Sequence, residues 1–259
     1  MNDVLQTIAN RISLRVYKDQ PIDETDKNAI IQAAMRAPTA GNQMLYSMIV
    51  IKDQANKKRL SELCDHQAFI AKAPLAIVFV ADHHKWFTYY QKNNVKQFCE
   101  DKDFQFEAPQ ESDLLLAIQD AMIAAQNSVI AAESLNIGSC YIGDIMENGE
   151  QVKELLKLPQ YTMPIGMLVY GYYPDNYPKI PKKRFDKEFI VFEDQYRELN
   201  NSEVDTMFKD EEKNYNPQNP YQAKNFAQQF YARKTGAPFS KEMARSVRFW
   251  LKQWDGRLL

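Results

Sequence analysis

A long, apolar helical segment at residues 113–135 constrains the fold more than any other stretch. Its leucine, isoleucine, valine and alanine side chains spread widely around the helix circumference. A helix that is apolar on so many sides needs cover on several of them, so we expect it to lie centrally on a sheet, with its twin in a dimer as a further source of cover. We expect Ser112 to cap its start and Gly138 to end it as a left-handed C-cap.

Apolar runs on either side of this helix predict the strands of that sheet. Buried strands are expected at residues 46–51, 75–81 and 164–172, with a short strand at 139–142 and a candidate fifth at 189–192. Helical patterns separate them, at residues 4–8, from Asp23 to Pro38, around 60–63 and at 150–156. The aromatic residues between 83 and 98 suit the core or a subunit interface better than a cofactor site. Two more helices are expected at 223–234 and 240–254.

The composition of the chain indicates which class of partner it binds. The chain has 259 residues, which fits one large domain or a domain with appendages. Lys and Arg number 32 against 34 Asp and Glu, so there is no global basic field to attract nucleic acid or an anionic membrane. We find no targeting pattern at the start and expect no segment to be apolar for long enough to span a bilayer, so we expect cytoplasmic residence and a small-molecule partner.

Several common chemistries have no sequence support. Cys64, Cys99 and Cys140 lie far apart and form no Cys-x-x-Cys pair, so neither a disulfide framework nor a metal site is expected. There is no Gly-x-Ser-x-Gly elbow, no phosphate-cradling Gly-x-x-x-x-Gly-Lys loop and no His-Glu-x-x-His. With only 8 glycines and no Gly-x-Gly-x-x-Gly array, a Rossmann dinucleotide site is also excluded.

A short segment near the start carries a candidate anion site. In an extended conformation Arg11, Ser13 and Arg15 share one face, while Ile12, Leu14 and Val16 occupy the other. Guanidinium groups and a hydroxyl are strong, directed donors to anionic oxygens, so this face could hold a phosphate and a second electron-rich group. The alternative is an exposed strand with solvated arginines.

Three further stretches could complete such a site. The small-residue loop 38–43 allows close approach of backbone to a ligand, although it could equally be a plain helix-to-strand turn. The strand that ends at Ile142 and Gly143 gives a second close approach, to something flat. A second cationic cluster lies at Lys182 to Arg184. Together they could enclose a mononucleotide that carries a planar ring.

Five motifs, in this order, resemble the nitroreductase family. They are Arg-x-Ser-x-Arg-x-Tyr from Arg11, the loop Ala37-Pro38-Thr39-Ala40-Gly41-Asn42-Gln43, Gln67 ahead of a short helix, residues 131–138 leading to Tyr141-Ile142-Gly143, and Lys182-Lys183-Arg184. Within that family, the chain most resembles the larger, NADPH-preferring branch. The resemblance implies an α+β fold with a central mixed, mostly antiparallel sheet wrapped by helices. It also implies a homodimer with FMN at the subunit interface, an FMN-binding core at 1–195 and a helical C-terminal extension at 196–259.

The resemblance also implies a role for each site residue. Arg11 and Ser13 would meet the FMN phosphate from one side, and Lys182 and Arg184 from the other. Arg15 would reach the pyrimidine edge of the ring and stabilise the anionic reduced flavin. The remaining cofactor contacts would be Gln67 at the same edge, Pro38, Thr39, Ala40 and Asn42 along the border, and Tyr141, Ile142 and Gly143 at the central ring.

No side-chain nucleophile is then needed, because the flavin carries the chemistry. The resemblance implies a ping-pong cycle in which NADPH or NADH reduces bound FMN and leaves before a nitroaromatic, quinone or flavin acceptor takes its place. Alternatives are a flavin reductase that supplies reduced FMN to a partner enzyme, and a flavin-binding protein without turnover. Arg233 and Lys234 are candidates for the donor's extra phosphate, or ordinary solvated charges. Asp144 departs from the glycine usual in this branch and could disfavour the reduced anion.

Overall fold

The computed structural model describes residues 1–256, which form two compact units. The first unit comprises residues 1–181 and 242–256, and the second comprises residues 182–241. These units divide at 181 and 241, whereas the functional boundary at residue 195 stays a prediction. Each unit is described by itself.

A four-stranded sheet forms the centre of the first unit. Its strands are β1 (Tyr46–Val50), β2 (Leu75–Asp82), β3 (Ile137–Ile142) and β4 (Thr162–Tyr172). They lie in the order β1-β2-β4-β3, and every neighbouring pair is antiparallel. β2 and nearly all of β4 are buried, as their unbroken apolar runs predict. The expected α+β fold with a mostly antiparallel sheet is confirmed.

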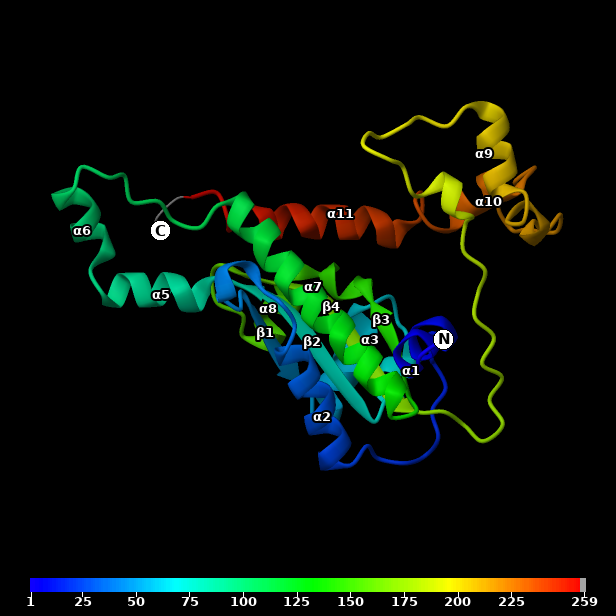
Figure 1. Cartoon of the computed structure of the whole chain (residues 1–259), viewed down its shortest axis with the longest axis horizontal. Helices are drawn as coiled ribbons and strands as arrows, with labels where there is room; N and C mark the ends of the chain where they lie inside the picture. The colour runs from blue at the N-terminus through cyan, green and yellow to red at the C-terminus, as the bar shows by residue number, and fades with distance from the viewer. Residues whose placement is uncertain (257–259) are drawn as a thin grey trace. The chain divides into compact units, whose positions relative to one another are not determined.

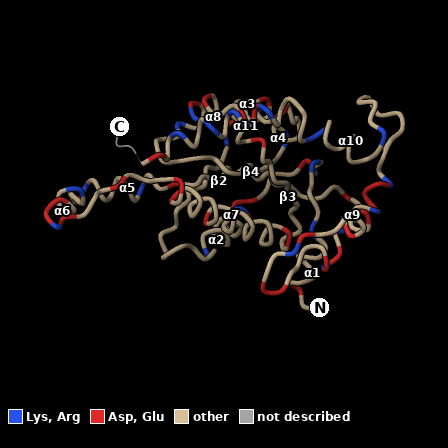
Figure 2. Tube along the Cα trace, turned by 90° about the horizontal axis from the view of Figure 1, so that it is seen from above, with Lys and Arg blue, Asp and Glu red and all other residues tan. Residues whose placement is uncertain are grey.

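Helices cover both faces of this sheet. The helices of this unit are α1 (Asp3–Asn10), α2 (Glu24–Met35), α3 (Gln54–Leu63), α4 (Ala68–Lys72), α5 (His84–Lys92), α6 (Val95–Asp101), α7 (Glu111–Ser134), α8 (Gly149–Leu156) and most of α11 (Pro238–Leu251), with 3-10 turns η1 (Ala40–Asn42) and η2 (Gly143–Met146). α7 crosses one face with α1 and α2 beside it, and α3, α4 and α8 cover the other (Figures 1 and 2). α5 and α6 project from this layered core (Figure 1).

The central helix α7 is confirmed, but its two ends differ from the sequence prediction. It begins at Glu111, where Gln110 and Asp113 form a capping box, so the assignment of Ser112 as the cap was wrong. The left-handed residue after the helix is Asn136, with φ of 58°. Gly138 lies inside β3 instead, so its assignment as the C-cap was also wrong. Asparagine tolerates the left-handed conformation because its short side chain can bond locally.

α7 also corrects the expectation about membrane-spanning segments. Among the described residues it is the one helix long and apolar enough, by length and composition, to cross a bilayer. Ten of its residues are buried inside the unit, and it packs on the sheet and on α2. The same apolar composition therefore serves a core helix, and it is weak evidence for a membrane.

Two glycines let the N-terminal segment lie against the sheet. A Cβ on Gly138 would stand 2.6 Å from Leu14 and 2.8 Å from Tyr173, and a Cβ on Gly171 would overlap the ring of Tyr17. Real Cβ atoms do not approach other atoms so closely, so Gly138 is required here for close packing. Its position thus explains how the segment 11–17 reaches the sheet edge.

The aromatic residues between 83 and 98 divide between core and surface. Phe87 is buried, with its ring centroid 4.8 Å from that of Tyr161 and 6.3 Å from that of Phe106. Trp86 donates from Nε1 to the carbonyl of Gln43 at 2.8 Å. Phe98, on the projecting helix α6, is more than half exposed. Part of this stretch is therefore core, as expected.

The second unit is built from short helices. They are α9 (Asn201–Phe208) and α10 (Phe226–Arg233), with 3-10 turns η3 (Lys187–Phe189) and η4 (Glu212–Asn214). The strand considered at 189–192 was wrong, because the amides of Ile190 and Val191 donate to the carbonyl of Lys187 in a local turn. α11 begins at the end of this unit, and its residues from Glu242 belong to the first, where Trp250 and Trp254 are fully buried.

Candidate functional site

The segment that carries Arg11, Ser13 and Arg15 is extended along the edge of β3. Ser13 forms a parallel bridge with Ser139, and the Leu14 amide donates to the Ser139 carbonyl at 2.9 Å. The prediction of an extended segment is confirmed, but fewer of its apolar side chains are buried than expected. Leu14 is completely buried, whereas Val16 is 59% exposed.

The polar side chains of this segment gather beside the buried thiol of Cys140. Burial raises the pKa of the Cys140 thiol, while the charge of Arg15, a hydrogen bond from Ser13 and the charge of Arg11 lower it. Burial likewise raises the pKa of Tyr141 to about 12, against the opposing charge of Arg11. Arg11 and Arg15 therefore both lie close to β3, while the role of this cluster as an anion site stays a prediction.

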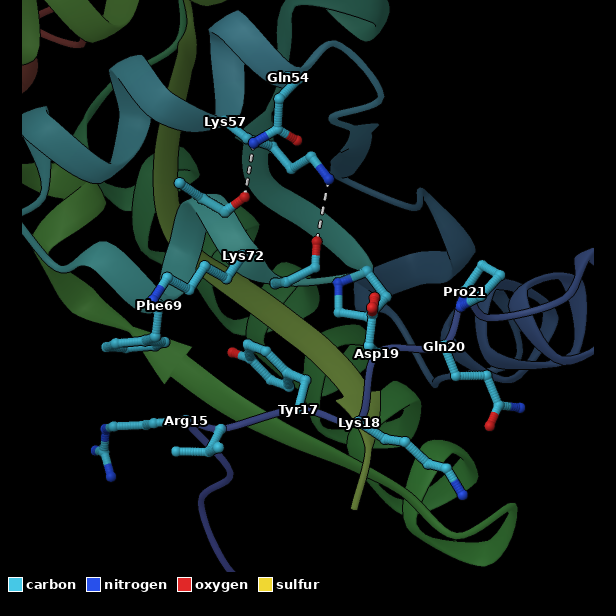
Figure 3. A pocket seen from close by; sticks show the side chains of 14 residues that line it. Arg15, Tyr17, Lys18, Asp19, Gln20, Pro21, Gln54, Lys57, Phe69 and Lys72 are labelled. Carbon is cyan, nitrogen blue, oxygen red and sulfur yellow. Dashed lines mark hydrogen bonds between the residues drawn. The ribbon is translucent and has the colours of Figure 1, made fainter. Parts of the chain in front are cut away.

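Arg15 connects this segment to α4. Its guanidinium carbon lies 5.8 Å from the centre of the Phe69 ring, a cation–π arrangement. Figure 3 shows Arg15 and Phe69 at one side of a cavity of about 630 Å³, with Lys18 directed away from both. This geometry places Arg15 where a ligand on the β3 edge could meet it.

Lys57 and Gln54, on the far wall of that cavity, support α4. Lys57 donates from Nζ to the carbonyl of Ala73 at 3.0 Å, and Gln54 donates to the carbonyl of Ala71 at 2.8 Å (Figure 3). Burial lowers the pKa of Lys57. A cation suits the C-terminal end of a helix, where unpaired carbonyls concentrate. These contacts therefore hold the helix that Gln67 precedes.

Gln67 has a fixed orientation. Its Nε2 donates to the carbonyl of Cys64 at 3.0 Å and to Oδ2 of Asp144 at 2.6 Å. A carbonyl and a carboxylate both require a donor, so the amide nitrogen must face them. The amide oxygen of Gln67 is then the atom left to accept a hydrogen bond from a ligand.

The end of β3 offers backbone at close range. Ile142 is buried and Tyr141 is half-buried, whereas a Cβ built on Gly143 would meet no atom within 4 Å. Asp144 follows directly, in the turn η2. Open space beside a glycine lets a flat ligand approach the main chain. The structure thus brings together seven of the predicted site residues, whose contacts with FMN stay a prediction: Arg11, Ser13, Arg15, Gln67, Tyr141, Ile142 and Gly143.

The predicted loop Pro38, Thr39, Ala40 and Asn42 lies elsewhere in the unit. It leads into β1, whereas the arginine segment borders β3, and these are the opposite edges of the sheet. Gly41 and Asn42 are both left-handed, with φ of 54° and 55°. One chain therefore does not bring this loop to the arginine segment.

Asp120, which the sequence analysis did not identify, fixes the conformation of that loop. It is 2% exposed on α7 and accepts from the amides of Ala40 at 2.9 Å and Leu45 at 3.1 Å. The sequence signal was an acidic residue in the middle of a helix whose other acidic residues, Glu111, Asp113 and Glu133, lie near its two ends. A carboxylate that accepts two backbone hydrogen bonds replaces the solvent which those amides would otherwise need.

Replacing Asp120 with asparagine tests this role. Asp120→Asn will lower the free energy of unfolding by about 1–3 kcal/mol, because one of the two amides will face an NH₂ group that cannot accept. Urea unfolding followed by circular dichroism measures the change. Glu111→Gln removes an equal charge from an exposed position on α7 and should cost less than about 1 kcal/mol. Equal losses in the two variants would contradict the assignment.

The second cationic cluster belongs to the second unit. Arg184 donates from Nη1 to the carbonyl of Lys182 at 3.2 Å, and Lys183 pairs with Asp210 at 2.7 Å. The share of Lys182 and Arg184 in a phosphate site stays a prediction. Arg233 and Lys234 end α10, where they lie over the rings of Phe230 and Phe239. Their role toward a donor also stays a prediction. Within residues 1–256 no cluster of three or more His, Cys, Asp or Glu has a metal-binding arrangement.

Comparison with known proteins places this arrangement in a family. The family model described as "Nitroreductase family" matches residues 8–172, which is more than half of the chain. An FMN reductase [NAD(P)H] of Bacillus subtilis is 33% identical over 207 residues, 79% of this chain and 78% of the relative. An oxygen-insensitive NADPH nitroreductase of Salmonella typhimurium is 33% identical over 199 residues, 77% of each.

A solved structure agrees in fold over the full length. Nitroreductase A from Vibrio parahaemolyticus is 26% identical, with a TM-score of 0.80 and 100% of both chains covered. The matched region 8–172 contains the arginine segment, Gln67 and the end of β3. The chain belongs to the nitroreductase family.

Proposed function

We propose that the chain is an FMN-dependent NAD(P)H oxidoreductase that reduces nitroaromatics, quinones or flavins. Its relatives named as FMN reductase and as NADPH nitroreductase support this class of reaction. The observation that carries the proposal is the convergence of Arg11, Ser13, Arg15 and the Gln67 amide at the open end of β3. When bound, FMN would supply the hydride-transfer chemistry between NAD(P)H and the acceptor.

The residues present fit FMN in charge and in shape. A phosphate needs several donors, and Arg11 and Ser13 provide them from an extended segment on the β3 edge. Lys182 and Arg184 are part of the same proposal, as further donors to the phosphate. The open space beside Gly143 suits the flat ring, because backbone can approach it without a side chain in between.

Two side chains fit the pyrimidine edge of the ring, where acceptor and donor atoms alternate. Arg15 offers a forked donor and a permanent positive charge, which stabilises negative charge that develops there. The Gln67 amide oxygen accepts a hydrogen bond, since its nitrogen is already committed to Cys64 and Asp144. Together they orient the ring, because one side chain donates to its acceptor atoms and the other accepts from its donor atom.

A homodimer would complete the site. The loop Pro38 to Asn42 lies at the β1 edge of the same unit, so a partner subunit's copy would border the cofactor that the first chain's arginine segment binds. Exposed apolar side chains on α1 and α7 support a subunit interface; they include Val4, Leu5, Ile8, Leu115, Leu116 and Ile123. Cytoplasmic residence is part of the same proposal, because reduced nicotinamide donors are cytoplasmic metabolites.

A second candidate is a flavin reductase whose product is reduced flavin for another enzyme. Relatives named as FMN reductase and NADPH-flavin oxidoreductase favour it. The two candidates share one site and differ in the acceptor. A flavin-binding protein without turnover is the remaining alternative, and it differs in having no reaction with NAD(P)H.

The purified protein provides the test. We expect it to be yellow, or to become yellow with added FMN, and to bleach when NADPH or NADH is added without oxygen. Colour should return faster with a nitroaromatic or quinone than with free FMN if the first candidate is correct, and the reverse if the second is. A protein that cannot be loaded with FMN would contradict both, and a yellow protein that neither donor bleaches would indicate the binding protein.

A further inference from the structure

A buried pair of carboxyl groups lies directly behind Gln67. Asp144 accepts from Gln67 Nε2 through Oδ2 at 2.6 Å, and a side-chain hydrogen bond joins Asp144 to Glu147. Glu147 is only 3% exposed. Two carboxylates cannot hydrogen-bond to each other, since neither would have a hydrogen to donate. One of the pair must therefore hold a proton.

The surroundings identify Glu147 as the group that holds this proton. Burial, together with the negative charge of Asp144, Asp65 and Glu242, raises the pKa of Glu147 to about 8. Its Oε1 is buried without a hydrogen-bond partner among the described residues, so an anion there would be poorly compensated. Asp144 in turn already accepts from Gln67. Glu147 thus acts as the donor, and Asp144 as the acceptor.

Titratable groups face Glu147 from three elements. Asp144 lies in η2, just before it; Asp65 and the buried Cys64 follow α3; and Glu242 lies on α11. Glu242 is paired with Arg245 at 2.8 Å, so its charge is offset in part. Burial raises the pKa of the Cys64 thiol, which stays neutral throughout the physiological range. Because the pKa of Glu147 is raised to about 8, Glu147 changes charge between pH 7 and 9.

This chain of contacts has a consequence for the cofactor site, on the basis of the proposed function. We propose that Glu147 is a positioning residue for FMN: its carboxylic acid holds Asp144, Asp144 holds the Gln67 amide, and loss of the Glu147 proton weakens FMN binding. Ionised Glu147 would repel Asp144, which is one of the two acceptors that keep the Gln67 oxygen toward the ring, and the Cys64 carbonyl would then hold the amide with one hydrogen bond in place of two. The site then binds FMN well only while Glu147 is protonated. Its apparent affinity for FMN falls in proportion to the fraction of protein in which Glu147 is protonated.

Titrations of the apoprotein with FMN at pH 7, 8 and 9, followed by quenching of flavin fluorescence, test the proposal. The phosphate of FMN is already a dianion in this window, since its second pKa is about 6. Wild-type protein should lose about tenfold in affinity between pH 7 and 9, because only about one chain in ten remains protonated one unit above the pKa. Glu147→Gln keeps a donor toward Asp144 in a side chain that does not titrate. The affinity of this variant for FMN should therefore change less than about twofold between pH 7 and 9.

Further variants distinguish positioning from a general loss of structure. Asp144→Asn removes the like charge and should also abolish the step in affinity, so it provides a second test if Glu147→Gln does not fold. Glu150→Gln should retain the step, since Glu150 is paired with Arg245 and its pKa is lowered to about 2. An equal step in wild type and Glu147→Gln would overturn the proposal.

Stability of the apoprotein gives a readout that needs no FMN. Because the folded state raises the pKa of Glu147 from 4.5 to about 8, folding takes up a proton between these values, and stability is lost as pH rises through them. The melting temperature of Glu147→Gln relative to wild type should therefore increase between pH 5 and 9. FMN binding with a flat pH profile would overturn this inference alone. No FMN binding by wild type at any pH would overturn the proposed function as well.

Discussion

Replacement of Arg15 with alanine will weaken FMN binding by about 10- to 100-fold. Arg15 is the one side chain of the segment that lies over Phe69, at the end of the site where Gln67 presents its amide. Hydrogen bonds to a charged donor contribute about 1.5–3 kcal/mol each, and 1.4 kcal/mol corresponds to a tenfold change in affinity. Reduction of bound FMN by NADPH should also slow, because positive charge at the ring edge is lost.

Two further variants show which property of Arg15 matters. Arg15→Lys keeps the charge but loses the planar fork, so it should recover the reduction rate more than the affinity. Lys18→Ala removes a cation three residues away whose side chain pairs with Asp175 instead, and it should leave both quantities unchanged. Titration of the apoprotein and stopped-flow reduction measure the two effects. An affinity for FMN in Arg15→Ala equal to that of wild type would exclude Arg15 from the site.

Truncation of Leu14 to alanine will have the largest effect on stability, a loss of about 2–5 kcal/mol. Leu14 is completely buried and packs where Gly138 has no side chain. Removal of its methyl groups leaves a cavity between the arginine segment and the sheet edge. Because Arg11, Ser13 and Arg15 depend on that contact for their position, FMN affinity should fall with stability.

Val16 provides a matched control on the same segment. It is 59% exposed, so Val16→Ala should change the free energy of unfolding by no more than about 0.5 kcal/mol. Chemical unfolding of the two apoproteins gives the comparison, and FMN titration at a temperature where both are folded gives the second readout. Similar losses of stability in both variants would mean that Leu14 does not anchor the segment.

The sequence determined more about local structure and chemistry than about the completed site. Unbroken apolar runs predicted β2 and β4, and the helix with apolar residues on several sides was α7, because burial on both faces or all around leaves no polar period. The alternation of Arg11, Ser13 and Arg15 predicted an extended cationic face. Residue type and period suffice for such features because they depend on neighbours only a few positions away.

Features that depend on contacts between residues far apart in the sequence could not be predicted from the sequence. Gly138 resembled a helix cap, yet its role is to admit Leu14 from a segment more than a hundred residues earlier. The loop from Pro38 to Asn42 matched a cofactor motif, and only the strand order places it at the opposite sheet edge from Arg11.

The residues behind the site show the same division. Gln67 was predicted from its motif, but the direction of its amide follows from Cys64 and Asp144. Glu147 had no sequence signal at all, since a glutamate near a turn is normally solvated. Burial among three other carboxylates changes its chemistry. The sequence alone determined which donor and acceptor groups the chain carries, while the tertiary structure decided which of them meet and which hold a proton, because desolvation and charge act through space.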